Sequence, residues 1–224
     1  MNSVLITGGT SGLGRSIAER FLAAGFSVYI HGRNSGGIRH LLKDSRCQFI
    51  RLDLRKPGDV RKLAGLAKRH RIDCFISNAG SYSDLGVAIP EKLCRDVMAV
   101  NLVAPILVLN AVYAHYRKLN SGTIVAINSL AGQYPNFNEA VYCASKYGLK
   151  GFIKSIQMDP RRNSVRILDY YPGAIKTRIT RNRPGFDQFI KPEDLADRIF
   201  ADVTSASSYI PVCQELRKSF PAGR

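Results

Sequence analysis

The chain has 224 residues, of which 45% are hydrophobic and 22% are charged. This length and composition are typical of one globular domain with a sizeable core. Lys and Arg outnumber Asp and Glu by 33 to 17, which gives a formal net charge of +16. Such a charge attracts anions of many kinds but says nothing about fold. No helix-turn-helix, zinc-finger or RNP pattern accompanies it, so we expect no nucleic-acid partner.

The apolar start of the chain lacks a basic leader and soon enters a glycine-rich loop, which indicates a buried strand and not a signal peptide. The longest apolar stretch, residues 97–114, is interrupted by Asn101, Pro105 and Asn110. A membrane span needs about 20 mostly apolar residues, so this stretch predicts a buried helix. The five cysteines are scattered and form no Cys-x-x-Cys pair. We therefore expect a cytoplasmic protein with free thiols, no metal site and no membrane partner.

Short apolar runs alternate with longer amphipathic segments. The runs predict strands at residues 3–7, 27–31, 47–52, 73–77, 122–128, 165–171 and 208–212. The longer segments predict helices at residues 13–24, 57–70, 90–119, 139–159 and 192–203. Pro57 and Pro192 stand at helix starts, where a missing N–H costs nothing. This alternation predicts a single α/β domain over residues 1–224, a Rossmann-type doubly wound parallel sheet of about seven strands with helices on both faces.

The first predicted strand runs into a glycine-rich turn and then a helix, Thr7-Gly8-Gly9-Thr10-Ser11-Gly12-Leu13-Gly14. Glycines allow a tight turn and the close approach of backbone to a pyrophosphate, which the helix N-terminus attracts. A Walker loop is excluded because no Gly-Lys-Ser/Thr occurs here. A turn without a ligand is the alternative, but the strand–turn–helix context favours a dinucleotide. The expected contacts are Gly8, Thr10, Ser11, Gly12, Leu13 and Gly14.

The end of the second strand indicates which nucleotide is bound. NAD enzymes usually place an acid there to bind the ribose 2′-OH, yet residues 20–43 contain no Asp or Glu. Gly32 stands where that carboxylate would lie. Arg33 follows with a planar, permanently charged guanidinium suited to a phosphate, and Arg15 offers a second contact. We therefore predict NADP(H), with an ordinary surface arginine as the alternative interpretation of Arg33.

Tyr142 and Lys146 lie at positions i and i+4 of a predicted helix and therefore on one face. A nearby ammonium stabilises a phenolate, so we expect Lys146 to lower the pKa of Tyr142 from its usual value near 10. A tyrosine tuned in this way can act as a general acid or base. Alone, this spacing is usually structural, because aromatic and basic residues often share a helix face.

Further motifs make this pair more specific, because together they resemble the short-chain dehydrogenase/reductase family in its own order. The glycine spacing T-G-x-x-x-G-x-G comes first. The other motifs are, in chain order, Asp53-Leu54, Ser77-Asn78-Ala79-Gly80, Asn101 within a helix, Ser129 after an apolar strand, Tyr142 with Lys146, and Tyr171-Pro172-Gly173-Ala174-Ile175-Lys176-Thr177. Ser77 replaces the first asparagine of the family's N-N-A-G motif. The resemblance covers most of the chain, from Thr7 to Thr177.

The resemblance implies roles for these residues. Tyr142 is the general acid in reduction and the base in oxidation, Lys146 tunes it and binds the nicotinamide ribose, and Ser129 stabilises the substrate oxygen. Asn101 orients a water that links Lys146 to solvent. Asp53 and Leu54 bind the adenine. The remaining cofactor contacts are expected from Asn78, Ala79, Gly80, Pro172, Gly173, Ile175 and Thr177.

These roles predict an NADP(H)-dependent oxidoreductase that interconverts a carbonyl and an alcohol, either a ketone or aldehyde reductase or an alcohol dehydrogenase. The cofactor supplies the hydride, and no metal ion is needed. The alternative is a catalytically silent NADP(H)-binding sensor or scaffold. Such relatives commonly lose the tyrosine or the lysine, whereas this chain keeps both.

Residues 174–191 are expected to form a short substrate lid. Lys176, Arg178, Arg181 and Arg183 bring four positive charges beside the expected pocket, with no acid before Asp187. One interpretation of this pattern is an anionic substrate, such as a sugar derivative or an acyl thioester. The alternative is an exposed loop whose charges are only solvated.

The family's usual Asp-Gly-Gly after the last strand is missing, and Cys213-Gln214-Glu215-Leu216 stands in its place. This departure puts the usual tetramer contact in doubt. A homodimer or homotetramer is still expected, with the dimer formed through the helices at 90–119 and 139–159.

Overall fold

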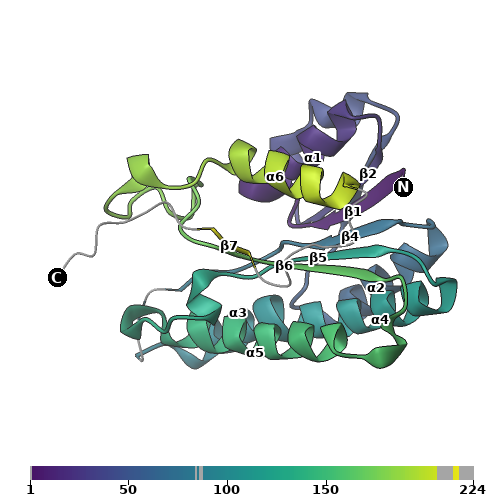
Figure 1. Cartoon of the computed structure of the whole chain (residues 1–224). Helices are drawn as coiled ribbons and strands as arrows, with labels where there is room; N and C mark the ends of the chain where they lie inside the picture. The colour runs from purple at the N-terminus through teal and green to yellow at the C-terminus, as the bar shows by residue number, and fades with distance from the viewer. Residues whose placement is uncertain (1, 84, 86–87, 206–213, 217–224) are drawn as a thin grey trace.

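A computed structural model of the chain describes residues 2–83, 85, 88–205 and 214–216. All of its strands belong to one parallel sheet in the order β3-β2-β1-β4-β5-β6-β7 (Figure 1). They are β1 Ser3–Thr7, β2 Ser27–Gly32, β3 Cys47–Arg51, β4 Cys74–Ser77, β5 Thr123–Ile127, β6 Arg166–Pro172 and β7 Gln214–Leu216. The predicted parallel sheet is confirmed, although β7 is only three residues long, so six strands make up most of it. The expected strand at 208–212 lies outside the described residues.

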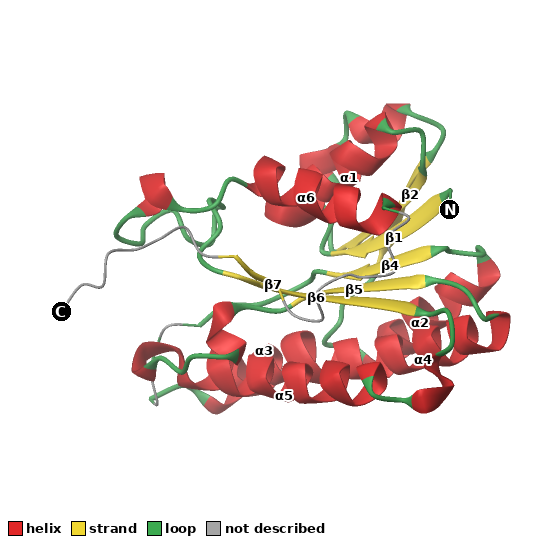
Figure 2. Ribbon diagram, in the orientation of Figure 1, coloured by secondary structure: helices red, strands yellow, loops and turns green. Residues whose placement is uncertain are grey.

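Helices cover both faces of the sheet, as predicted. They are α1 Gly12–Ala23, α2 Pro57–Arg69, α3 Glu91–Met98, α4 Ala104–Leu119, α5 Ala140–Gln157 and α6 Pro192–Thr204. Figure 2 shows α1 and α6 on one face and α2 to α5 on the other. Pro57 and Pro192 are the first residues of α2 and α6, where proline sacrifices no hydrogen bond. Successive side chains of a strand point to opposite faces of the sheet, so the core has two parts. Val4 and Ile6 pack with α1 on one face, and Leu5 packs with α4 on the other.

The expected helix at 90–119 begins at Glu91 and contains an irregular stretch. Residues Ala99–Val103 wind as a π-helix between α3 and α4, a widened turn that is common at functional sites. The run Glu91–Leu119 is long and apolar enough to cross a membrane by length and composition alone. Here one side of α4 packs in the core through Val108, Leu109 and Val112.

The strand order reverses direction at β1, whose neighbours are β2 and β4. Connections from β1 and from β4 therefore leave in opposite directions, and a crevice opens at the carboxyl ends of these strands. Side chains and loops that follow β1 to β6 converge there.

Candidate active site

The crevice is a cleft of about 810 Å³ at the carboxyl ends of the strands. Most of the predicted site residues line it: Gly8, Thr10, Ser11, Gly12, Leu13, Gly14, Arg33, Asp53, Leu54, Asn78, Ala79, Gly80, Ser129, Tyr142, Lys146, Pro172, Gly173, Ile175 and Thr177. Arg15 lines an adjoining cleft of about 690 Å³ that shares Arg33. Residues scattered over most of the chain thus meet in one place.

The glycine-rich turn lies against the end of β4. Gly8 has a φ of 66°, and a Cβ added to it would lie 2.8 Å from the Ala79 Cα, so both its conformation and its contact require glycine. The Asn78 side chain holds this turn by donating to the carbonyl oxygens of Thr7 at 2.9 Å and Gly8 at 3.3 Å. Ser11 precedes α1 without a side-chain capping bond. The first N–H groups of α1 therefore face the cleft as donors for a phosphate.

His31 connects the glycine-rich turn to the loop after β3. Its Nδ1 accepts from the Gly8 N–H at 3.4 Å, and its Nε2 lies 3.2 Å from the Leu52 carbonyl oxygen. Burial lowers the pKa of His31 to about 4, so the neutral imidazole donates through Nε2 and accepts through Nδ1. The sequence analysis did not identify this residue. A lone histidine at the end of an apolar strand was the available signal.

At the nucleotide end of the cleft, a side chain at position 32 would require Thr10 to shift. A Cβ added to Gly32 would lie 2.6 Å from the Thr10 Cγ2. The Nε of Arg15 pairs with Glu19 at 3.5 Å and forms no hydrogen bond with a described residue. The basic side chains that line the adjoining cleft are Arg15, Arg33, Lys176, Arg178 and Lys191. A cleft lined by several guanidinium and ammonium groups suits an anionic group such as a phosphate.

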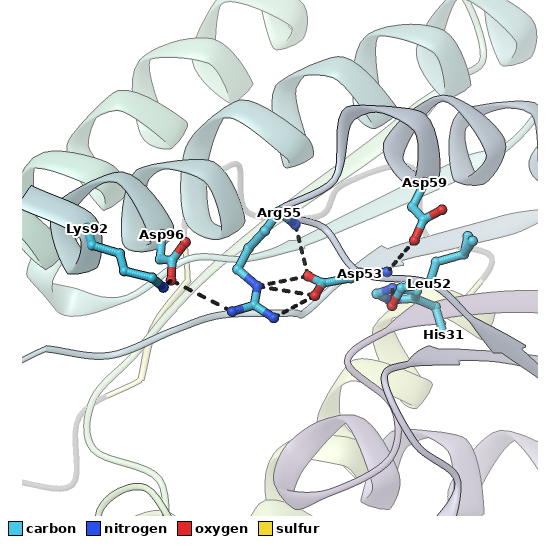
Figure 3. Close-up of polar contacts among 7 residues, drawn as sticks. All are labelled: His31, Leu52, Asp53, Arg55, Asp59, Lys92 and Asp96. Atoms are coloured by element: carbon cyan, nitrogen blue, oxygen red, sulfur yellow. Dashed lines mark hydrogen bonds and ion pairs between the residues drawn. The ribbon is translucent and has the colours of Figure 1, made fainter.

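In the loop after β3, Asp53 forms a two-pronged ion pair with Arg55 (Figure 3). The Arg55 Nη2 lies 2.6 Å from Oδ2 of Asp53, and the Arg55 Nε lies 3.0 Å from Oδ1. These hydrogen bonds hold the pKa of Asp53 at about 2. Arg55 also reaches Asp96 on α3 at 3.7 Å. Sequence reasoning missed Arg55, although it stands two residues after the predicted adenine-binding acid.

Tyr142 and Lys146 share one face of α5 and line the cleft, as their spacing predicts. Burial raises the pKa of Tyr142 to about 12, while a hydrogen bond with Ser129 works in the opposite direction. In the protein alone the pKa of Tyr142 thus lies above its usual value, and the tuning of Tyr142 by Lys146 stays a prediction. The Lys146 Nζ lies 5.8 Å from the centre of the phenol ring and donates to the Ile127 carbonyl at 3.1 Å. Because the ammonium is held by β5, burial dominates at the phenol.

Lys146 itself is buried, which lowers its pKa to about 8. Asp169 on β6 opposes this shift through its charge. Asp169 is also buried, and it accepts a 2.5 Å hydrogen bond from Tyr171. The Asn128 side chain at the end of β5 acts on the same carboxylate. A buried acid therefore lies behind the lysine, where sequence analysis identified only an apolar strand.

Asn101 lies beneath the cleft wall, within the π-helical turn. Its side chain accepts from the Ser81 N–H at 2.7 Å and donates to the Ser81 carbonyl at 2.7 Å and the Ser145 Oγ at 3.2 Å. These three bonds fix the loop after β4 to the start of α5. Asn101 thus has a positioning role here, and its expected contact with a water next to Lys146 stays a prediction.

Three residues distant in sequence form a charged group beside Tyr142. Glu139 is buried, accepts from the Tyr82 hydroxyl at 2.7 Å and pairs with Arg183 at 3.3 Å. The Tyr82 ring meets the Tyr142 ring edge-on at 5.3 Å. Glu139 raises the pKa of Tyr142 and Arg183 lowers it. Sequence analysis missed Glu139, although it lies three residues before Tyr142 and therefore near the same helix face.

The basic segment 176–183 is partly neutralised within the chain. Lys176 pairs with Asp187 at 3.4 Å, and Arg183 pairs with Glu139. Arg178 lines both clefts and forms no ion pair with a described residue. The charge available to a substrate is therefore smaller than the count of basic residues indicates.

Comparison with known proteins supports the same family as the sequence motifs. The sequence model of the short chain dehydrogenase family matches residues 2–186. The chain is 32% identical over 186 residues to the 3-oxoacyl-acyl-carrier-protein reductase of Buchnera aphidicola, covering 80% of this chain and 76% of that protein. It is 30% identical over 227 residues to sulfoacetaldehyde reductase 2 of Chromohalobacter salexigens, covering 90% and 88%.

Solved structures share the fold over the whole chain. A metagenomic short-chain oxidoreductase in complex with NADP is 26% identical, with a TM-score of 0.82 and 98% of each chain covered. A 4-hydroxyisoleucine dehydrogenase complexed with NADH is 22% identical, with a TM-score of 0.88 and all of each chain covered. Because the family model and these relatives match most of its sequence, this chain belongs to the short-chain dehydrogenase family, whose members are NAD(P)-dependent oxidoreductases.

Proposed function

We propose that the chain is an NADP(H)-dependent carbonyl reductase or alcohol dehydrogenase. The observation that carries this proposal is the meeting of Tyr142, Lys146 and Ser129 with the glycine-rich turn in one cleft. The preference for NADP(H) over NAD(H) is supported by a glycine at position 32, where a carboxylate would repel a phosphate, and by Arg15 and Arg33 in the cleft beside it. A relative solved with NADP supports this choice.

Bound NADPH would supply the hydride to the carbonyl carbon. Tyr142 donates its phenolic proton to the carbonyl oxygen, which becomes the hydroxyl, and the phenol becomes a phenolate. Ser129 donates a hydrogen bond to the same oxygen as charge develops on it. Lys146 is positively charged below a pH of about 8 and stabilises the phenolate until it is reprotonated. Oxidation of an alcohol runs these proton transfers in reverse.

The anionic substrate is supported by fewer groups than the sequence predicts. Arg178 is the basic residue of the segment that faces the cleft without an ion pair to a described residue. Two relatives are named as reductases of 3-oxoacyl-acyl-carrier-protein and of sulfoacetaldehyde. We keep an anionic carbonyl compound as the proposed substrate class, with residues 174–191 as its lid within a single domain.

A homodimer is proposed through the outer faces of α4 and α5. Val103 and Leu107 are each about half exposed, at 50% and 52%, although both are apolar. They lie one turn apart on a helix whose opposite side is already in the core. An apolar stripe of this kind is commonly covered by a second copy.

Replacing Tyr142 by Phe tests the proposed function. The variant keeps the ring and loses only the hydroxyl, so NADPH oxidation with a panel of carbonyl compounds should fall by about 1,000-fold or more. The dissociation constant for NADPH, measured by nucleotide fluorescence, should stay within about threefold. Full activity in the variant would refute the mechanism. Binding of NADPH by the native protein without turnover of any carbonyl compound would favour a sensor or scaffold.

A further inference from the structure

Asp169 is a buried acid that the proposed mechanism does not use. It lies on β6 and is only 1% exposed, and its Oδ2 accepts a hydrogen bond of 2.5 Å from the Tyr171 hydroxyl on the same strand. Carboxylates are almost never fully buried in proteins unless a charge or several donors compensate them. The position of Asp169 in the sheet indicates which charge is its partner.

Lys146 lies in the same layer of the molecule, between α5 and the sheet. It is 4% exposed, and its Nζ donates to the Ile127 carbonyl at the end of β5. In the register of β5 and β6, Ile127 pairs with Tyr170, and Asp169 is the residue before Tyr170. Tyr170 packs on the face of α1 and α6, so its neighbour Asp169 points toward α5. Neighbouring strands are about 4.8 Å apart, so the acid lies close to the place where the ammonium is held.

The contact with Ile127 does not compensate the charge of Lys146, because a carbonyl oxygen is neutral. Burial favours the neutral amine, the charge of Asp169 opposes it, and the pKa of Lys146 is about 8. Burial also raises the pKa of Asp169, to about 7. The acid therefore gains its negative charge in the pH range in which the lysine would otherwise lose its positive charge.

Several further groups surround Asp169 and its partner on β6. The charged and titratable groups are Lys146 and Lys154 on α5, Lys150 on α5 at 5.9 Å from the centre of the Tyr171 ring, Tyr171 itself, and Glu215 of β7, which is in register with Tyr171. The Asn128 side chain acts on the acid from the end of β5. Of the three lysines, Lys146 is the one that lines the cleft. Asp169 can therefore influence the reacting groups through Lys146.

We propose that Asp169 is a positioning residue for the reaction, which keeps Lys146 charged and in place by supplying the negative charge that the Ile127 carbonyl lacks. This inference rests on the proposed function, in which the Lys146 ammonium stabilises the phenolate of Tyr142. Asp169 is not among the residues that line the cleft. It therefore acts through the lysine and not on the substrate or the nucleotide.

The first test measures the ionisation of Lys146 directly and needs neither substrate nor nucleotide. The protein is labelled with lysine that carries ¹³C at Cε, whose chemical shift follows the charge of the amine. The Lys146 signal is assigned by its loss in Lys146→Arg. Asp169→Asn removes the charge of the acid but keeps its size and an acceptor for Tyr171. The pKa of Lys146 should fall by about one unit or more in this variant.

The second test shows whether this charge matters to the reaction. The basic limb of kcat/KM for carbonyl reduction by NADPH should move to lower pH together with the pKa of Lys146, because the neutral amine no longer stabilises the phenolate. Tyr171→Phe keeps the acid but removes its hydrogen bond, so it should move the limb in the same direction by a smaller amount. A merely structural role of Asp169 would lower kcat/KM at every pH and leave the limb in place.

Asp202→Asn is the control, because Tyr170 donates to Asp202 on the opposite face of β6. This variant should change neither the Lys146 titration nor the limb. A Lys146 pKa that is equal in Asp169→Asn and in the native protein would overturn the inference, and so would a limb that stays in place while that pKa falls. A native protein that reduces no carbonyl compound would overturn the proposed function, whereas the Lys146 titration would still show whether Asp169 holds its charge.

Discussion

Tyr171 donates a 2.5 Å hydrogen bond to Asp169, and both residues are buried on the α5 side of β6. The charged groups that act on Asp169 come from α5, namely Lys154 and Lys146, while Asn128 contributes from the end of β5. Burial outweighs all of them and raises the pKa of Asp169 to about 7. The arrangement makes this acid a titrating group of the folded protein near neutral pH.

Stability should therefore depend on pH through Asp169. Its folded pKa is above the unfolded value, so its contribution to the free energy of unfolding is full below about pH 4 and is lost as the pH rises through about 7. Asparagine does not titrate. Urea unfolding measures the free energy of unfolding of Asp169→Asn relative to that of the native protein. This difference should shift in favour of the variant between pH 5 and pH 8, by on the order of 1 kcal/mol or more.

A matched control lies on the opposite face of the same strand. Tyr170 donates to Asp202 at 2.7 Å, and Arg198 pairs with that acid. Asp202→Asn removes a comparable tyrosine–aspartate bond away from α5 and should not reproduce the gain at high pH. A stability difference for Asp169→Asn that is constant from pH 5 to 8 would contradict the assignment.

The charged group beside Tyr142 should shift the pH profile of alcohol oxidation in two directions. Oxidation needs the phenolate, and Glu139 raises the pKa of Tyr142 while Arg183 lowers it. Glu139→Gln should move the acidic limb of kcat/KM to lower pH by about one unit, and Arg183→Gln should move it to higher pH. Arg181→Gln, an exposed neighbour, is the control. Shifts of both variants in the same direction would show that the pair acts by folding alone.

Cofactor choice should reverse when the charge beside Gly32 is reversed. Arg33→Asp removes a guanidinium and adds a carboxylate that repels the 2′-phosphate. The ratio of kcat/KM for NADPH over NADH should fall by about 100-fold. Steady-state kinetics with both nucleotides measures it, and an unchanged ratio would refute the preference for NADP(H).

The remaining anion contact should be visible in KM. Arg178→Gln should raise KM about tenfold for a carboxylated or phosphorylated carbonyl compound and leave KM for a neutral aldehyde of similar size unchanged. Arg181→Gln should affect neither substrate. Equal KM values for the charged substrate in native protein and in Arg178→Gln would mean that the basic segment is only solvated.

The association state should depend on the exposed apolar side chains of Val103 and Leu107. Leu107→Lys places a charge in the proposed contact and should shift the sedimentation profile toward the monomer. Leu119→Lys is the control, because Leu119 is similarly exposed, at 58%, at the end of the helix. If both variants sediment as the native protein does, the dimer surface lies elsewhere.

Local patterns in the sequence were sufficient to predict most of the fold. The first six strands match their predicted ranges within one residue at each end, since parallel strands buried on both faces are continuously apolar. The glycine-rich turn and Tyr142 with Lys146 were recognisable because their function depends on close sequence spacing. The structure brings them into one cleft, as the family resemblance implies.

The features that the sequence analysis did not predict depend on contacts between distant segments. Glu139 meets Arg183 across 44 positions, and no local pattern indicates that pairing. Spacing placed Lys146 on the face of Tyr142, but the direction of its long side chain is set by the Ile127 carbonyl on another strand. The pKa of Tyr142 therefore follows its burial, which sequence spacing does not report.

His31 has a consequence for every pH experiment on this cleft. Its imidazole joins the turn that begins at Gly8 to the loop that carries Leu52, and it stays uncharged at any pH well above 4. The glycine-rich turn and the loop after β3 are thus joined by a histidine whose pKa lies well below its usual value. A change of rate near neutral pH therefore does not report the ionisation of His31.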